Sequence, residues 1–281
     1  MAIQSLVIGC GYIGLPLALR LKEWGHEVTA WVHSSLRAEE LAAHQFPRVI
    51  VGDVADADLW STIEETYQLV IHCASSGGGG ESAYEQVFLK GVLLMNEFQP
   101  NARRLFMSST SVYGQTDGEV VTEKSPAEPD AATSRVLRTA EKVALEHDAT
   151  VVRSSGIYGP GRGVLFEKLR RDEAVIEGDG LRWINQIHQR DLVIALTYLI
   201  DAGVPGEVYN VTDDTPVTYH DYYAWCSEFL GKPMPPYGPV NTQRKRGLTN
   251  KRVSNEKLRA AGWTPLYPSF REGLEADYSP K

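Results

Sequence analysis

Cysteine is scarce in this sequence: three residues, Cys10, Cys73 and Cys226, are spread over 281 positions without a Cys-x-x-Cys pair. Such spacing argues against a disulfide framework and against a cysteine zinc site. We therefore expect no metal centre. Unpaired cysteines are typical of a reducing compartment, so the sequence favours a cytoplasmic protein.

Long hydrophobic runs are absent as well. No stretch reaches the roughly 20 consecutive apolar residues that a membrane-spanning helix needs. Residues 5–21 are apolar, but they carry three glycines and no basic leader precedes them, so they do not fit the pattern of a signal peptide. We expect no membrane partner.

Positive charge is in deficit, because 28 lysines and arginines face 36 acidic residues and the net charge is −8. Nucleic-acid binding requires a concentrated basic face. The one basic cluster, QRKR at residues 243–246, is too short to provide it. We expect no nucleic-acid partner and a small-molecule substrate instead. A homodimer is compatible with the sequence but is not specified by it.

What the sequence does contain is a regular alternation of strands and helices. Apolar runs predict strands at residues 5–8, 28–32, 49–51, 69–73, 104–107 and 150–153, and helical spacing predicts helices at residues 13–24, 37–44, 84–98, 134–147 and 192–200. Continuous apolar strands that alternate with helices are typical of a parallel sheet covered on both faces. The sequence therefore predicts an α/β fold with a Rossmann-type doubly wound sheet.

A glycine-rich loop connects the first predicted strand to the first helix. It reads Gly-Cys-Gly-Tyr-Ile-Gly, a G-x-G-x-x-G motif, and its expected cofactor-binding residues are Gly9, Gly11, Tyr12, Ile13 and Gly14. The glycines allow a sharp turn and a close approach of the backbone to a pyrophosphate, which the helix N-terminus then attracts. The alternative is a turn that serves packing alone. The strand-turn-helix context favours a dinucleotide site.

The end of the second strand bears on the choice of dinucleotide. NAD sites usually place an Asp or Glu there to bind the ribose 2′-OH. This sequence has His33, Ser34 and Arg37 instead, which could contact a 2′-phosphate, so NADP is favoured over NAD. The alternative is that these residues only begin a helix, because serine is a good N-cap.

Other cofactor contacts are expected at the ends of the third and fourth strands. Asp53 and Val54 follow the third strand, where an acid can meet the adenine; a solvated turn is the alternative for Asp53. Cys73, Ala74 and Ser75 end the fourth strand at the same sheet edge. Residues 76–81 (SGGGGE) come next, either as a loop that closes over the nicotinamide or as a flexible connector.

Several short segments occur in a fixed order along most of the chain. Besides the glycine loop they are Gly-Asp-Val at 52–54, Val-Ile-His-Cys-Ala at 70–74, SSTSVYG at 108–114, Thr-Glu at 122–123, Arg153, Tyr-Gly-Pro-Gly at 158–161, Gly-Asp-Gly at 178–180, Ile-His at 187–188, Asp-Leu at 191–192 and Tyr-Asn-Val at 209–211. In this order they resemble the short-chain dehydrogenase/reductase superfamily in its extended form, which includes NAD(P)-dependent nucleotide-sugar epimerases and dehydratases.

The resemblance implies a division of the chain. Residues 1–155 would form the NAD(P)-binding Rossmann domain, to which residues 185–212 return. Residues 156–184 and 213–281 would form a small C-terminal substrate domain. The side chains then available for polar or phosphorylated groups are Arg162, Arg182, Asn185 and Arg244 or Arg246.

The resemblance also identifies what is missing at the reacting centre. It assigns Ser109 to hold the reacting oxygen, the alternative being a polar turn at a strand end. The family's Tyr-x-x-x-Lys pair is replaced here by Thr133 and Leu137. The lysine normally lowers the phenol pKa from about 10, which lets the tyrosine act as an acid or base, and a threonine beside a leucine cannot be tuned in that way. Tyr113 is the candidate replacement.

The glycine loop departs from the extended pattern too, because Ile8 occupies the first position of the usual G-x-x-G-x-x-G. The chain is thus similar to an atypical subgroup that lacks the active-site tyrosine. Two functions remain open. One is an NAD(P)-dependent oxidoreductase, epimerase-like, that acts on a small or nucleotide-linked carbonyl or hydroxyl compound. The other is a catalytically silent NAD(P)-binding sensor or scaffold.

Overall fold

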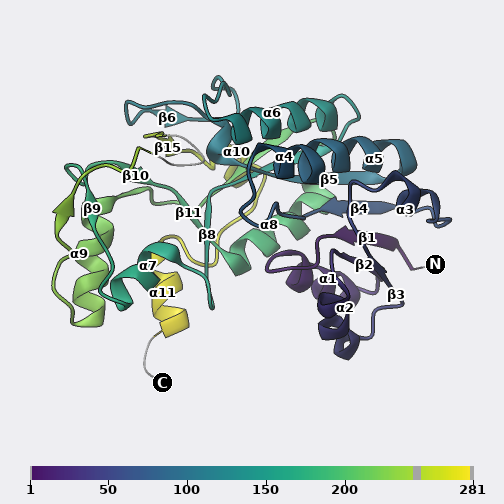
Figure 1. The fold of residues 1–281 in the computed structure, drawn as a ribbon, viewed down its shortest axis with the longest axis horizontal. Coiled ribbons are helices and arrows are strands. Elements are labelled where there is room, and N and C mark those ends of the chain that lie inside the picture. Colours follow the sequence, from purple (N-terminus) through teal and green to yellow (C-terminus); the bar gives the residue numbers. More distant parts are fainter. Residues whose placement is uncertain (1, 243–247, 279–281) are drawn as a thin grey trace.

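The computed structural model describes residues 2–242 and 248–278. Its centre is a seven-stranded sheet with the strand order β12-β7-β5-β4-β1-β2-β3, in which every neighbouring pair is parallel (Figure 1). The strands are β1 (Gln4–Ile8), β2 (Glu27–Val32), β3 (Arg48–Val51), β4 (Leu69–His72), β5 (Arg103–Ser109), β7 (Thr150–Ser154) and β12 (Val208–Val211). The predicted Rossmann-type doubly wound sheet is confirmed, and β12 adds a seventh strand.

Helices cover both faces of the sheet, and each face has its own apolar cluster (Figure 1). One face carries α1 (Gly14–Glu23), α2 (Ser35–Leu41), α8 (Gln189–Ala202) and α10 (Glu256–Ala260). The other carries α3 (Ala57–Ser61), α4 (Glu81–Tyr84), a π-helical segment (Glu85–Lys90), α5 (Gly91–Phe98) and α6 (Ala132–Leu145). Short 3-10 turns lie at Ala42–His44 and Thr110–Val112. Because both faces are buried, the strands read as continuous apolar runs.

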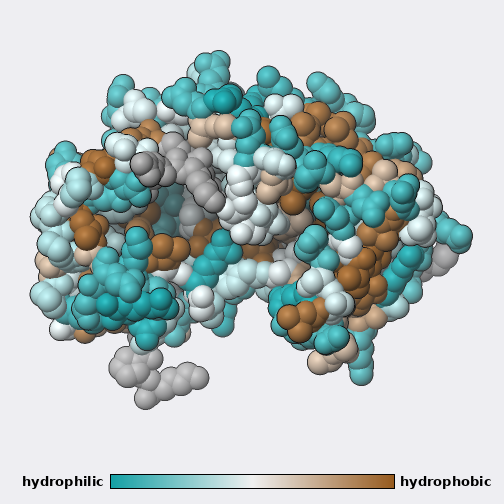
Figure 2. All heavy atoms as spheres, viewed as in Figure 1, coloured by the Kyte–Doolittle hydropathy of each residue, from teal (hydrophilic) through white to brown (hydrophobic). Residues whose placement is uncertain are grey.

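A third apolar cluster lies away from the sheet, between α7 (Val164–Arg170), α9 (Tyr219–Leu230) and α11 (Phe270–Tyr278). Four small two-stranded pairs lie outside the main sheet: β8 (Gly156–Tyr158) with β11 (Gln186–His188), β9 (Ile176–Glu177) with β14 (Tyr237–Gly238), β10 (Trp183–Ile184) with β13 (Val217–Thr218), and β6 (Val120–Val121) with β15 (Arg252–Val253). Figure 2 shows the surface hollowed between this part and the part formed by α1 and α2.

Two buried residues near the C-terminus pack apart from the second unit that the sequence predicts. Leu258 and Trp263 are buried in the cluster that α1 and α8 form on the main sheet, whereas the sequence assigned all of residues 213–281 to a second unit. The apolar spacing of a short helix such as α10 predicts that one face is buried, but it does not show which apolar cluster that face packs against.

The strand order determines where a ligand can bind. The order reverses between β1 and β4, which are neighbours in the sheet although β2 and β3 lie between them in the chain. At such a point the loops leave in opposite directions and open a crevice beyond the carboxyl ends of the strands. The loops that follow β1, β2, β4 and β5 all begin at this carboxyl edge of the sheet. No helix within the described residues is long and apolar enough to cross a membrane.

Candidate functional site

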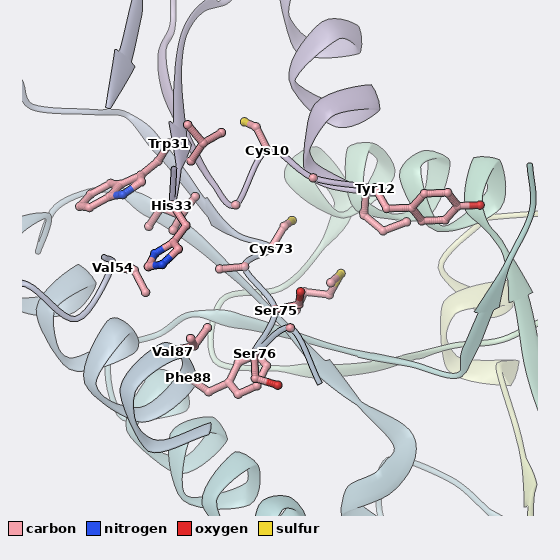
Figure 3. A pocket seen from close by; sticks show the side chains of 18 of the residues that line it. Cys10, Tyr12, Trp31, His33, Val54, Cys73, Ser75, Ser76, Val87 and Phe88 are labelled. Atoms are coloured by element: carbon pink, nitrogen blue, oxygen red, sulfur yellow. The ribbon is translucent and has the colours of Figure 1, made fainter. Parts of the chain in front are cut away.

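A cavity of about 640 Å³ occupies this crevice. Nearly all the predicted cofactor-binding residues line it: Gly9, Gly11, Tyr12, Ile13, His33, Ser34, Arg37, Asp53, Val54, Cys73, Ala74 and Ser75. Figure 3 shows His33 and Val54 at one end, and Ser75, Ser76 and Phe88 at the other. Segments far apart in the sequence therefore meet around one space large enough for an extended ligand.

The three glycines of the first loop have different surroundings. Gly9 has a φ of +87° and a Cβ there would lie 2.4 Å from the backbone of Ala74, while a Cβ on Gly14 would lie 2.2 Å from the Gly9 carbonyl oxygen. Both glycines are therefore required by the packing of the chain itself. Gly14 is not among the lining residues. Gly11 lines the cavity, and a Cβ there meets nothing closer than 4.0 Å, so the structure leaves that space to a ligand.

The residues after β2 combine capping with cavity lining. The Ser34 hydroxyl oxygen accepts a hydrogen bond from the Arg37 backbone N–H at 3.4 Å, so Ser34 caps α2 as the alternative interpretation proposed. The Arg37 side chain folds back over the glycine loop, where its Nε donates to the Cys10 carbonyl at 3.4 Å. It also forms an ion pair with Glu40. A cation thus lies at the end of the cavity where the sequence placed the 2′-phosphate.

The ends of β3 and β4 supply the opposite wall. The Asp53 carboxylate accepts a hydrogen bond from the Ala55 backbone N–H at 2.9 Å, which holds the turn in place. Cys10 and Cys73 are buried beside each other, and burial raises the pKa of both thiols, that of Cys10 to about 12. These cysteines stay protonated at neutral pH and act as small apolar lining groups. No group of three or more metal-ligating side chains occurs in residues 2–242 and 248–278.

Ser109 lies at the other end of the cavity, where β5 ends. Its hydroxyl oxygen accepts a hydrogen bond from the Ser111 backbone N–H at 3.2 Å, which orients the side chain. Leu137 of α6 lines the same cavity, and Thr133, one turn earlier on α6, lines a smaller adjoining one. The two positions at which the sequence placed the missing tyrosine and lysine therefore do face the ligand space.

Tyr113, the other catalytic candidate, does not line either cavity and is fully buried. Its hydroxyl donates to the Asn210 side-chain oxygen at 2.8 Å and accepts from the Arg153 guanidinium at 2.8 Å. Burial raises the pKa of Tyr113, although Arg153 opposes that shift. A phenol so enclosed makes no contact with a ligand, so its placement argues against the expected role as an acid.

Tyr113 belongs instead to a buried polar network beneath the reacting end. Glu141 of α6 accepts two hydrogen bonds from Arg153 of β7, at 2.9 and 2.7 Å, and a third from the Ser108 hydroxyl at 2.6 Å. Arg138 adds an ion pair to Glu141 at 3.0 Å. The network ties α6 to β5 and β7, and so holds the strand end that carries Ser109. Sequence reasoning matched Arg153 to the family but did not connect it to Glu141.

His72 is a further residue that the sequence analysis did not single out. It lies at the end of β4, fully buried, and its Nε2 is 3.0 Å from the carbonyl oxygen of Val87 in the π-helical segment. Burial lowers the pKa of His72 to about 4, so the neutral ring donates to that carbonyl. The segment contributes Val87 and Phe88 to the cavity wall, and Tyr84 precedes it.

Only some of the expected substrate-binding residues in the second half of the chain lie at the cavity. Arg162 lines the cavity and its guanidinium lies over the Tyr12 ring at 5.1 Å. Arg182 stacks on Tyr219 at 4.5 Å, and Asn185 bonds the backbone of Lys251 and Val253; neither lines the cavities. Arg244 and Arg246 lie outside the described residues.

Two curated proteins are similar over nearly the whole chain. Protein YeeZ of Escherichia coli (strain K12) is 27% identical over 263 residues, which cover 89% of this chain and 92% of that protein. The 3-diazoavenalumate denitrifying reductase of a Streptomyces species is 28% identical over 311 residues and covers 96% and 99%.

Among solved structures, the dTDP-glucose 4,6-dehydratase of Bacillus anthracis, in complex with NAD, has the same fold with a TM-score of 0.82 at 20% identity, covering 98% of this chain and 95% of that one. The model of the NAD dependent epimerase/dehydratase family matches residues 5–212, about three quarters of the sequence. This match confirms the resemblance to the extended short-chain enzymes. The chain belongs to the NAD dependent epimerase/dehydratase family.

Proposed function

We propose that this chain binds NADP in preference to NAD and transfers a hydride between the nicotinamide and a small or nucleotide-linked organic substrate. The observation that carries the proposal is the open space over Gly11 at the switch point of the sheet. A Cβ on Gly11 would meet no close neighbour, and a pyrophosphate would fit over this glycine at the N-terminus of α1.

The preference for NADP rests on the residues after β2. No carboxylate follows the strand at the position where NAD enzymes bind the ribose 2′-OH. His33, Ser34 and Arg37 line this end of the cavity, and the Arg37 guanidinium can bind a phosphate with charge-assisted hydrogen bonds.

Each side chain at the reacting end has a limited role. The bound nicotinamide supplies or accepts the hydride. Ser109 would hold the acceptor atom of the substrate through its hydroxyl. Thr133 and Leu137 offer no tuned acid, and Tyr113 is committed to the buried network.

We assign residues 156–184, with the segments of 213–281 that pack on α7 and α9, to the substrate side of the crevice. A homodimer and a cytoplasmic location stay predictions.

A site with a hydride donor but no tuned acid favours substrates that need no proton from the protein. Such an acceptor already bears positive charge or carries a leaving group that departs with its electron pair. The similar Streptomyces protein is named a denitrifying reductase of a diazo compound. In the reaction that we propose for this chain, a hydride adds to the carbon of an aryl diazonium acceptor, the carbon–nitrogen bond breaks, and its electron pair leaves with dinitrogen. We propose this class of acceptor ahead of simple carbonyl compounds.

The alternative is a catalytically silent NAD(P)-binding sensor or scaffold, which the loss of the tyrosine and lysine would also explain. Turnover of NADPH with a panel of aryl diazonium salts, iminium compounds, carbonyl compounds and nucleotide sugars separates the two. Reduction of a panel member that falls at least 10-fold in Ser109→Ala supports the proposal. Binding of NADPH without any turnover supports the sensor. The double variant Thr133→Tyr/Leu137→Lys then asks whether restoring the pair creates activity toward carbonyl substrates.

A further inference from the structure

A second cavity of about 350 Å³ adjoins the reacting end of the first. It shares Tyr84, Phe88 and Arg162 with the large cavity, and Thr133 lines it from α6. The glycine-rich loop after β4 lines it as well. A group bound here would therefore lie next to the position at which Ser109 and the nicotinamide would meet the substrate.

The charge that lines this second cavity is positive. Arg162 is the only charged side chain among the described residues that line it, and no carboxylate in residues 2–242 or 248–278 forms an ion pair with Arg162. A guanidinium stays protonated at any physiological pH and offers its donors in a fixed fork. The Tyr12 ring, 5.1 Å from the Arg162 guanidinium carbon, supports one face of the fork and leaves its donor edge for a ligand.

The loop of residues 75–79 also lines this cavity. Gly77 and Gly78 have φ values of +61° and +80°, and a Cβ on either would meet nothing within 4 Å. The Gly79 N–H donates to the Ser76 carbonyl at 3.0 Å, which closes the turn. The loop therefore adds no charge of its own, and within the part of the chain that the structure describes Arg162 alone sets the charge of the cavity.

We propose that this second cavity binds an anionic group of the substrate, a carboxylate or a phosphate, through Arg162. The inference extends the proposed function, since it adds that the hydride acceptor carries an anion a short distance from its reacting carbon. It also explains how a site without a tuned acid can still orient a small molecule, because an ion pair at one end and Ser109 at the other define its direction.

Isothermal titration calorimetry of the full chain, with and without saturating NADPH, tests this site. The probes are trans-cinnamate, its neutral counterpart cinnamamide, and benzyl phosphate. We expect one of the two anions to bind at least about 10-fold more tightly than cinnamamide, as a charge-assisted pair implies. Arg162→Gln should remove that advantage, and Arg162→Lys should keep part of it. Arg170→Gln, which changes an exposed arginine on α7, should leave it unchanged.

The outcomes separate this inference from the proposed function. A preference for trans-cinnamate identifies a carboxylate site, and a preference for benzyl phosphate identifies a phosphate site. Equal binding of cinnamamide and the anions, no binding of either anion, or an unchanged Arg162→Gln would each overturn the inference. If Arg162→Gln weakens NADPH instead, the arginine serves the cofactor and the inference is also wrong. If the wild-type chain fails to bind NADPH, the proposed function fails, while the titration without cofactor still decides the anion site.

Discussion

The imidazole of His72 and the carbonyl of Val87 are joined by a 3.0 Å hydrogen bond at the point where the helix of residues 81–98 becomes π-helical. A π-turn leaves a carbonyl without its usual helical donor, and the buried ring supplies one. Gly91 makes the approach feasible, because a Cβ there would lie 2.9 Å from His72 Nε2. The bond directs Val87 and Phe88 into the cavity wall, so a residue outside the cavity shapes it.

This bond predicts a pH dependence of stability. Burial lowers the pKa of His72 from 6.5 to about 4, so the unfolded chain takes up a proton below pH 6.5 that the folded chain does not. The free energy of unfolding should therefore fall between pH 7.5 and pH 5, with about 2 kcal/mol of the fall due to His72. Urea denaturation of His72→Gln should lack that part of the fall. His147→Gln, a change on the surface, should retain it, and equal pH profiles for all three proteins would contradict the assignment.

The two glycines of the first loop should respond differently to alanine. Gly11→Ala adds a methyl group to the open cavity, so the melting temperature should stay within about 2 °C while the affinity for NADPH falls at least 10-fold. Gly14→Ala forces a methyl group against the Gly9 carbonyl, so both stability and affinity should fall. Thermal unfolding and NADPH titration of both variants check this. Unchanged affinity in Gly11→Ala would mean that the loop serves packing alone.

Arg37 should distinguish the two dinucleotides. Loss of a charge-assisted contact to a 2′-phosphate costs about 1.5 kcal/mol or more, so Arg37→Ala should weaken NADPH at least about 10-fold. NADH, which has no such phosphate, should change by less than about threefold on the same scale. Glu40→Gln is the matched control, since it removes the partner of Arg37 and keeps the cation. Fluorescence titration gives the four affinities; an equal loss for both dinucleotides would place Arg37 on the shared pyrophosphate instead.

The buried Glu141–Arg153 pair should be needed for stability. Glu141→Gln leaves the Arg153 guanidinium buried without a counter-charge, which costs about 3 to 5 kcal/mol of unfolding free energy. The matched change Glu167→Gln breaks an exposed ion pair with Arg170 and should cost less than about 0.5 kcal/mol. Denaturation in urea measures both. A loss below 1 kcal/mol in Glu141→Gln would show that the network contributes little to the fold.

The sequence predicted the sheet and most of the cavity because both depend on local pattern. Apolar runs identify strands, and a glycine loop between a strand and a helix identifies one wall, so Gly9, Gly11 and Arg37 could be assigned without coordinates. Parallel strands then bring their carboxyl ends to one edge, which places Asp53 and Ser75 there too.

The rest depends on contacts between distant residues, which no local pattern contains. Tyr113 follows Ser109 closely, yet its hydroxyl partners lie 40 and 97 positions further on. Nothing near Tyr113 in the chain indicates that it is enclosed. The same holds for His72, since its partner Val87 lies in a π-turn that helical spacing does not reveal. Arg162 was recognised as an available cation, but only the folded chain shows the second cavity beside it.

The most direct test of the account is a titration of the purified chain with NADPH and with NADH, followed by energy transfer from tryptophan to the reduced nicotinamide. Trp31 lines the cavity and is one suitable donor. The account predicts saturable binding in the micromolar range, tighter for NADPH, and at least about 10-fold weaker in Gly11→Ala. Absence of binding to either dinucleotide would contradict the account, because the glycine loop would then be architecture without a cofactor and the proposed hydride transfer would have no donor.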